Sequence, residues 1–144
     1  MSLWKRTSSV AELNQRCEGT IHDSLGIQFT ALTEDSISAS MPVDARTVQP
    51  IGLLHGGASV VLAESLGSMA SILAVEEGAL AVGVEVNANH VRSARNGVVT
   101  GTARPIHIGQ TIHVWSIEIR DSMDQLVCVS RLTTSIRAPK VRPA

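Results

Sequence analysis

Hydrophobic and polar positions along the chain follow two different periods, which predict strands in some stretches and helices in others. Near the start, Ser9 followed by Glu12 has the spacing of a capping box, so we expect a short helix over 10–17. Alternation then predicts strands over 25–33 and 36–43, joined by the turn TEDS. Alternation returns in the second half of the chain, where the turn signals SARNG, HIGQ and DSMD separate four more predicted strands: 80–92, 97–107, 111–120 and 125–136.

Between these two sets of strands, the residues from Leu54 to Glu77 have a helical period, and Gly78 is well placed to end the predicted helix. Glu64 is the only charged residue between Gly56 and Val75. A helix face in contact with water carries several charged residues, so we expect both sides of this helix to be covered. One predicted side holds Leu62, Leu66, Met69 and Leu73, and the nearly opposite side holds Val60, Glu64, Ser68, Ser71 and Val75.

The order of the predicted elements is a short helix, two strands, one long helix and four strands. The simplest arrangement of these parts is an antiparallel sheet packed against the long helix, which is an α+β architecture. No repeat or linker divides the chain, so we expect one domain over 1–137 and a flexible tail over 138–144. Because a chain of this length is too short to supply another layer, we expect a second subunit to cover the outer side of the helix.

Along the predicted strand 80–92, an apolar row ends in two polar side chains. The row consists of Val82, Val84, Val86, Ala88, His90 and Arg92. Such endings often border sites, so we expect His90 and Arg92 to lie next to a site, on the same face of the strand as the valines.

The composition argues against several classes of partner. The chain has a formal net charge of −1 and a pI of about 6.5, so no basic excess indicates a nucleic acid or a membrane surface. Its aromatic residues are Trp4, Phe29 and Trp115, too few for a surface that stacks nucleic-acid bases. The first residues lack the apolar core of a signal peptide, and no uncharged apolar run of about 18 residues follows. We therefore expect a cytoplasmic protein.

Metal, redox and serine-hydrolase chemistry find no support in the spacing of the reactive residues. Cys17 and Cys128 match no metal or redox motif, and we expect them to pack in the interior. The histidines form no HExxH and stand beside no CxxC, so no metal is expected. A GxSxG elbow, a GxGxxG turn and a GK[ST] loop are all missing from the sequence, which argues against a Ser-His-Asp hydrolase and a nucleotide-binding loop.

The long predicted helix carries two features with chemical potential, and each has an ordinary alternative. Glu64 is either a carboxylate at the edge of a subunit interface or a surface glutamate of an amphipathic helix. Ser68, one turn further along, is either a partner of Glu64 or a small packing residue. At the front of the helix, LHGG (54–57) offers either unpaired backbone N–H groups for a developing oxyanion or a tightly packed helix start.

Three segments strongly resemble hotdog-fold acyl-CoA thioesterases: MPVDARTVQPIGLLHGGASVVLAESLGSMA at 41–70, VNANHVRSARNG at 86–97 and PIHIG at 105–109. Within this family, the likeness is to the enzymes that act on 1,4-dihydroxy-2-naphthoyl-CoA in menaquinone synthesis and to those that proofread enterobactin assembly. The resemblance extends from about Leu3 to Ile136. It implies a hotdog fold, in which an antiparallel sheet wraps around one long central helix, and assembly into a homodimer or homotetramer.

The resemblance also implies roles for individual residues. Glu64 resembles the catalytic carboxylate, acting either as a nucleophile or as a general base on water. The backbone N–H of Gly56 would polarise the thioester carbonyl, with His55 and Gln49 shaping that side of the site.

Further roles concern the water, the leaving group and coenzyme A. Ser68 and His90 would orient the attacking water or the departing thiolate, with His90 supplied by the strand that meets the partner subunit. Arg92, Arg95 and His107 are candidates for binding the nucleotide phosphates of coenzyme A. The alternatives are solvated charges for the two arginines and a turn residue for His107.

The resemblance implies an enzyme that hydrolyses an aroyl- or short acyl-CoA thioester, or the corresponding acyl carrier protein thioester, to the free acid. Coenzyme A is then part of the substrate, and no separate cofactor is expected. Ile51 and Ile72 stand where members of the family often carry aromatic residues, and with Met69 they predict a different shape for the acyl pocket. Two alternatives are a non-catalytic acyl-CoA-binding module and a hydratase on the same fold, which would pair Asp and His after a different motif.

Overall fold

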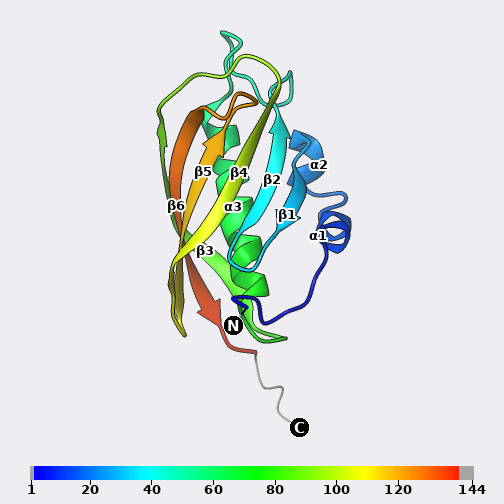
Figure 1. The fold of residues 1–144 in the computed structure, drawn as a ribbon, viewed down its shortest axis with the longest axis vertical. Helices are drawn as coiled ribbons and strands as arrows, with labels where there is room; N and C mark the ends of the chain where they lie inside the picture. Colours follow the sequence, from blue (N-terminus) through cyan, green and yellow to red (C-terminus); the bar gives the residue numbers. More distant parts are fainter. Residues whose placement is uncertain (1, 140–144) are drawn as a thin grey trace.

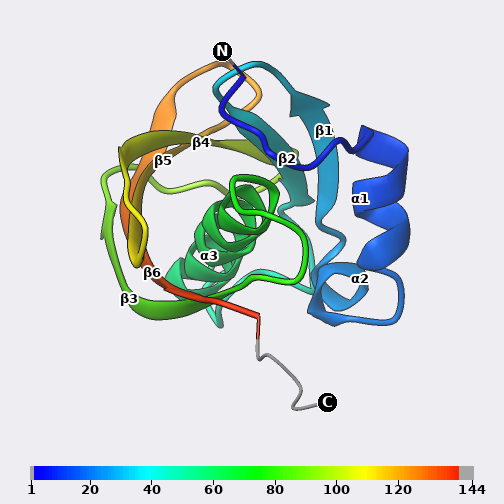
Figure 2. The same ribbon diagram turned by 90° about the horizontal axis from the view of Figure 1, so that it is seen from below.

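The computed structural model describes residues 2–139, in which one antiparallel sheet curls around a long central helix. Figure 2 looks along this helix and shows the sheet wrapped around it. The helices are α1 (Val10–Arg16), α2 (Ile21–Leu25) and α3 (Gly56–Leu73). The strands are β1 (Gln28–Leu32), β2 (Ile37–Pro42), β3 (Leu80–His90), β4 (Val98–Ile108), β5 (Ile112–Arg120) and β6 (Leu126–Arg137). The predicted hotdog architecture of the α+β class is confirmed, whereas residues 140–144 of the predicted tail lie outside the described residues.

The strands follow the order β1-β2-β4-β5-β6-β3, and all neighbouring pairs are antiparallel (Figure 1). The chain passes from β2 through α3 to β3, which joins the sheet at its far edge beside β6. β1 and β3 are therefore the two edge strands. The start of α3 and the end of β3 meet at one end of the molecule, where the N–H of Leu54 donates to the carbonyl of Ala94 (2.7 Å).

The central helix is shorter than the predicted 54–77 because the N-terminal segment closes its C-terminal end. The carbonyl of Leu73 accepts hydrogen bonds from the N–H groups of Lys5 (2.8 Å) and Arg6 (3.1 Å). The Arg6 guanidinium donates to three carbonyls in the turn that follows, those of Val75, Glu76 and Ala79. Gly78 does not end the helix as predicted; with a φ of 83° it turns the chain towards β3.

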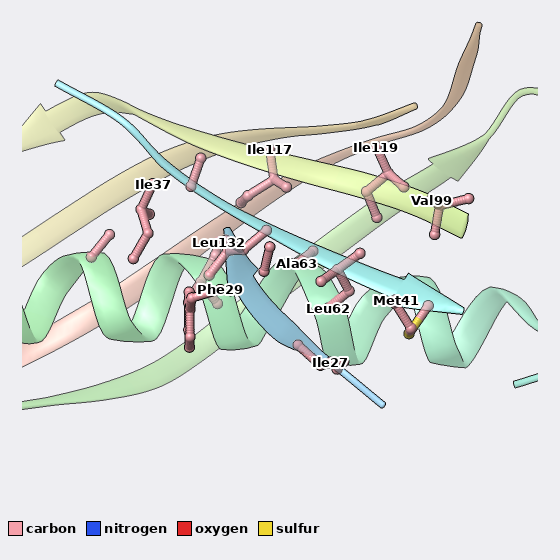
Figure 3. Close-up of a cluster of buried hydrophobic side chains, with 14 of the residues drawn as sticks. Ile27, Phe29, Ile37, Met41, Leu62, Ala63, Val99, Ile117, Ile119 and Leu132 are labelled. Carbon is pink, nitrogen blue, oxygen red and sulfur yellow. The ribbon is translucent and has the colours of Figure 1, made fainter. Parts of the chain in front are cut away.

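The hydrophobic core lies between α3 and the inner face of the sheet (Figure 3). On the helix, Leu62, Leu66 and Leu73 of the predicted apolar stripe are fully buried. They pack in one cluster with sheet residues such as Ile37, Met41, Val99, Ile117, Ile119 and Leu132. α3 is long and apolar enough to span a membrane, but the core helices of soluble proteins often have the same length and hydropathy. Half of α3 is buried in the structure.

The other side of α3 has no covering layer within residues 2–139. Its partly exposed residues are Val60, Val61, Glu64, Ser65, Ser68 and Ile72, whereas Met69 of the predicted apolar stripe is partly exposed but packs against the core. Ser71 and Val75, predicted on this side, are instead buried. Ser71 accepts a hydrogen bond from the Trp115 indole (2.7 Å) and shares another with Thr134 (2.8 Å), so its hydroxyl belongs to the core.

A β-bulge in β3 changes which side chains face the helix. Gly83 pairs with Thr134 and Glu85 pairs with Thr133, so Val84 is an extra residue in the strand. The bulge reverses the alternation, and the predicted common face of Val82, Val84 and His90 is therefore wrong. Val82 and Val84 are 46% and 56% exposed. Arg92 lies beyond the end of β3, in the following loop.

The short helices cover one edge of the sheet. The capping box of α1 is confirmed, since the Glu12 N–H donates to Ser9 Oγ (3.2 Å) and the Glu12 carboxylate accepts from the Ser9 N–H (2.7 Å). The helix α2 was not predicted, because its five residues are too few to show a helical period. It begins after the cap residue Thr20 and ends at Gly26, which has a φ of 69°.

Candidate active site

A cavity of 340 Å³ opens at the N-terminal end of α3, beside the end of β3. Its walls bring together four residues predicted for the site, namely Gln49, Gly56, His90 and Arg92. Ser59 also lines the cavity and was not predicted, although its spacing of three residues from Gly56 places it on the same side of the helix. The remaining walls are Leu53, Leu54, Val91, Ser93 and Val127.

Gln49 lies in a tight loop that leads into α3. The N–H of Gln49 donates to the carbonyl of Leu53 (2.8 Å), and Gly52 reverses the chain with a φ of 81°. The side-chain carbonyl of Gln49 accepts from the N–H of Ile51. The NH₂ group of Gln49 has no acceptor within the described part of the chain, and it can therefore donate to a ligand in the cavity.

The first turn of α3 offers one unpaired N–H at the cavity. His55 caps the helix, because its Nδ1 accepts from the N–H of Gly57 (2.8 Å), and in the neutral imidazole the proton is then on Nε2. The N–H of Gly56 has no acceptor among residues 2–139. Since the positive end of the helix dipole lies at this point, an oxygen that gains negative charge is stabilised here.

The His90 side chain lies directly over Gly56 of the same chain. A Cβ added to Gly56 would be 2.7 Å from His90 Nε2 and 3.1 Å from the neighbouring ring carbons. Any larger residue at position 56 would therefore require the His90 imidazole to shift from this place. As a result, an unpaired N–H and an imidazole border the same cavity within one subunit.

Glu64 lies further along α3, on its partly exposed side. Its carboxylate accepts no hydrogen bond and forms no ion pair with any residue from 2 to 139. It packs instead against the backbone of β3, where a Cβ added to Gly83 would fall on Glu64 Oε1. Ser68 follows one helical turn later and is also partly exposed. The structure thus holds an unpaired anion beside a bare stretch of backbone.

Glu64 and Gly56 are too far apart to act together within one chain. Eight residues separate them on α3, which corresponds to about 12 Å at about 1.5 Å per residue. A carboxylate that attacks a carbonyl carbon lies about 3–3.5 Å from that carbon. Within one chain, Gly56, His90 and Gln49 therefore lie together at the cavity, and Glu64 and Ser68 lie apart from them on the open side of the helix.

The three residues predicted for phosphate binding are not gathered in one place. Arg92 lines the cavity, and Arg95 follows in the same loop; both are exposed, and neither forms an ion pair within the described residues. His107 lies near the far end of β4, about 30 Å along that strand from the loop, at about 3.3 Å per residue. It folds over the β4–β5 turn, where its Nε2 would be 2.6 Å from a Cβ added to Gly109. Within one chain, only the arginines are placed to share a ligand with the cavity.

The remaining reactive side chains are inert packing residues or lie away from the cavity. Burial raises the pKa of the Cys17 and Cys128 thiols, which disfavours their thiolate forms. Burial also lowers the pKa of His113, whose ring packs edge-on against Trp115. Within residues 2–139 no group of three His, Cys, Asp or Glu side chains is arranged to hold a metal ion.

Comparison with known proteins finds thioesterases that match nearly the whole chain. The family model described as the thioesterase superfamily matches residues 51–128. A 1,4-dihydroxy-2-naphthoyl-CoA hydrolase from Escherichia coli is 53% identical over 134 residues, which cover 93% of this chain and 98% of that protein. A proofreading thioesterase from Cronobacter turicensis is 46% identical over 134 residues, again 93% of this chain and 98% of that protein. The crystal structure of a thioesterase from Haemophilus influenzae superposes with a TM-score of 0.95 at 49% identity and covers 99% of both chains.

Proposed function

This chain belongs to the thioesterase superfamily and is a thioester hydrolase, and we propose that it hydrolyses an aroyl- or short acyl-CoA to the free acid and coenzyme A. Glu64 is the reactive carboxylate in this proposal, and the N–H of Gly56 binds the oxygen of the thioester carbonyl. The unpaired state of the Glu64 carboxylate carries the proposal. Within residues 2–139 the Glu64 carboxylate has no hydrogen-bond donor and no cation, so it is free to act on a bound thioester.

We propose that a second copy of the chain completes the site, because Glu64 and Gly56 are about 12 Å apart on one helix. β3 is an edge strand with exposed apolar side chains at Leu80, Val82 and Val84, and such an edge favours pairing with another strand. If two β3 strands pair antiparallel about a twofold axis, the His90 end of one lies beside the Leu80 end of the other. Because Glu64 packs against Gly83 in that half of β3, this pairing brings Glu64 of the partner subunit towards the cavity.

The chemistry requires one carboxylate and one oxyanion site. Glu64 either attacks the thioester carbon, forming an anhydride that water then hydrolyses, or takes a proton from a water molecule that attacks the same carbon. In both routes the carbonyl oxygen becomes negative and accepts the hydrogen bond of Gly56 at the positive end of α3. The intermediate then expels the thiolate of coenzyme A, which leaves readily and needs no strong acid. Ser68 and His90 orient the water or the departing thiolate.

Side chains near these groups support the proposed substrate class. Ile72 follows Glu64 and Ser68 on the partly exposed side of α3, and Met69 lies at the edge of the core beside them, so the acyl group would meet branched and flexible aliphatic side chains. Arg92 and Arg95, exposed at the cavity and its loop, are the cations available to coenzyme A phosphates. The E. coli relative acts on 1,4-dihydroxy-2-naphthoyl-CoA, which supports an aroyl-CoA as the first substrate to try. An acyl carrier protein thioester would present the same reactive group.

The proposal is tested by measuring thiol release from a panel of thioesters: 1,4-dihydroxy-2-naphthoyl-CoA, benzoyl-CoA, butyryl-CoA and a matching acyl carrier protein thioester. The proposal predicts catalytic release of free thiol from at least one of the CoA substrates. Tight binding of every CoA thioester without release would identify a binding module instead. Addition of water to an unsaturated acyl-CoA with the thioester left intact would identify a hydratase.

A further inference from the structure

The lack of a side chain at Gly83 leaves space for the Glu64 carboxylate, whereas the Gly83 backbone does not adopt a positive φ that would require glycine. It lies within β3, pairs with Thr134, and is not among the residues with positive φ. A Cβ at this position would fall on Glu64 Oε1, 3.5 Å from Glu64 Cδ and 3.8 Å from Leu132 Cδ1. Any larger residue would therefore occupy the place of the carboxylate.

The bulge at Val84 is what turns Gly83 towards the helix. In an unbroken strand, Val84 would share the inner face with Val86, and Gly83 would point outward. The register shift between Gly83 and Glu85 exchanges these positions, so that Val84 is exposed and Gly83 faces α3. The strand thus presents bare backbone where regular alternation would present a valine side chain.

Nothing else within residues 2–139 fixes the Glu64 carboxylate. It has no hydrogen-bond donor and no cation, so its position depends on packing alone. Glu64 is partly exposed on α3, and its carboxylate lies against the backbone of Gly83 on β3. A change in that surface therefore moves the carboxylate without breaking any other interaction.

We propose that Gly83, turned inward by the bulge at Val84, is a positioning residue that sets where the Glu64 carboxylate lies relative to the thioester. This inference rests on the proposed function, because it takes Glu64 as the reactive group. A Cβ at position 83 displaces the carboxylate, and displacements of about 1 Å in an active site reduce rates by about 100-fold.

The test combines Gly83→Ala with Glu64→Asp in a double-mutant cycle. Gly83→Ala is expected to lower kcat by roughly 30- to 100-fold with KM changed by less than about threefold. Glu64→Asp shortens the side chain and withdraws the carboxylate from the added methyl group. The further loss caused by Glu64→Asp is therefore expected to be at least about fivefold smaller in the Gly83→Ala protein than in the wild type. Independent, multiplicative losses would overturn the inference.

Gly101→Ala is the matched control. It is also a strand glycine that faces α3, and its Cβ would lie 2.7 Å from Leu66 Cδ1, far from any carboxylate. We expect it to lower the melting temperature, to leave kcat per folded enzyme unchanged, and to show no coupling with Glu64→Asp. If Glu64→Asp couples equally with Gly101→Ala and with Gly83→Ala, the coupling would come from general crowding in the core, and the inference would be overturned.

Stability measurements keep the inference testable even if Gly83→Ala folds poorly. Adding Glu64→Ala removes the side chain that the new methyl group meets, so the double variant is expected to melt at a higher temperature than Gly83→Ala alone. No recovery would overturn the inference. The proposed function is tested separately: it fails if the Glu64→Gln enzyme retains activity. If Glu64→Gln is inactive but Gly83→Ala has the kcat of the wild type, only the positioning role of Gly83 is overturned.

Discussion

Replacing Glu64 by glutamine removes the carboxylate that the proposed function takes as reactive and disturbs little else. The side chains have nearly the same shape, and the Glu64 carboxylate makes no hydrogen bond or ion pair within residues 2–139 that the substitution could break. Because the side chain is also partly exposed, the stability is expected to change by less than about 0.5 kcal/mol. Any large effect on turnover therefore reports on chemistry.

The magnitude follows from the role of the group. An amide can neither attack the thioester carbon nor accept a proton from water, so we expect kcat to fall at least about 10³-fold, or about 4 kcal/mol in the activation barrier. KM is expected to change little, because no binding contact is lost. Ser68→Ala is expected to cost only about tenfold, since Ser68 orients a reactant and does not itself react.

The assay is thiol release under saturating CoA thioester, with circular dichroism to verify folding. Glu18→Gln is the matched control, because Glu18 is an exposed carboxylate between α1 and α2, away from α3 and β3, and its side chain forms no hydrogen bond or ion pair within residues 2–139. We expect its kcat to stay within about twofold of the wild type. A folded Glu64→Gln enzyme that retains more than about a tenth of wild-type kcat refutes the catalytic assignment.

Further predictions concern assembly, coenzyme A binding and acid stability. Dilution to a monomer is expected to abolish turnover, and sedimentation that finds an active monomer at assay concentration would contradict a shared site. Arg92→Ala and Arg95→Ala are expected to raise KM and to leave kcat nearly unchanged, and His107→Ala is measured in the same way. An unchanged KM in any of these variants would show that the replaced residue does not bind the phosphates. Because burial lowers the pKa of His113, the unfolded chain binds more protons just below the ordinary histidine pKa, so stability falls as the pH drops from about 7 towards 5. His113→Phe should reduce that fall in urea titrations at each pH, and an unchanged pH dependence would contradict this cause.

The sequence predicted the strands and the central helix well because the hydrophobic periods are long and uninterrupted. The capping box at Ser9 and Glu12 was visible for the same reason, since its chemistry is local. The end of α3 could not be predicted, because Arg6 binds carbonyls about 70 residues away in the chain. A contact of that kind depends on the tertiary fold and leaves no local pattern.

The sequence named several residues that the structure brings together, but it did not predict how the candidate residues are arranged. Gln49, Gly56, His90 and Arg92 do meet at one cavity. The bulge in β3 was invisible, because alternating valines in the sequence suggest an unbroken strand. The separation of Glu64 from Gly56 was implicit in the helix rise, but it acquires meaning only once His90 is seen beside Gly56 in the same chain.

The most direct test of the central claim, a glutamate-dependent thioesterase site shared between two subunits, is complementation between two chains that each lack a different residue of the site. Glu64→Gln and His90→Ala proteins are purified separately, unfolded, mixed in equal amounts and refolded together. In a shared site, each mixed dimer holds one site with both native residues, so random pairing is expected to restore roughly a quarter of wild-type thiol release. If Glu64 and His90 of the same chain served one site, the mixture would be no more active than the two variants refolded apart.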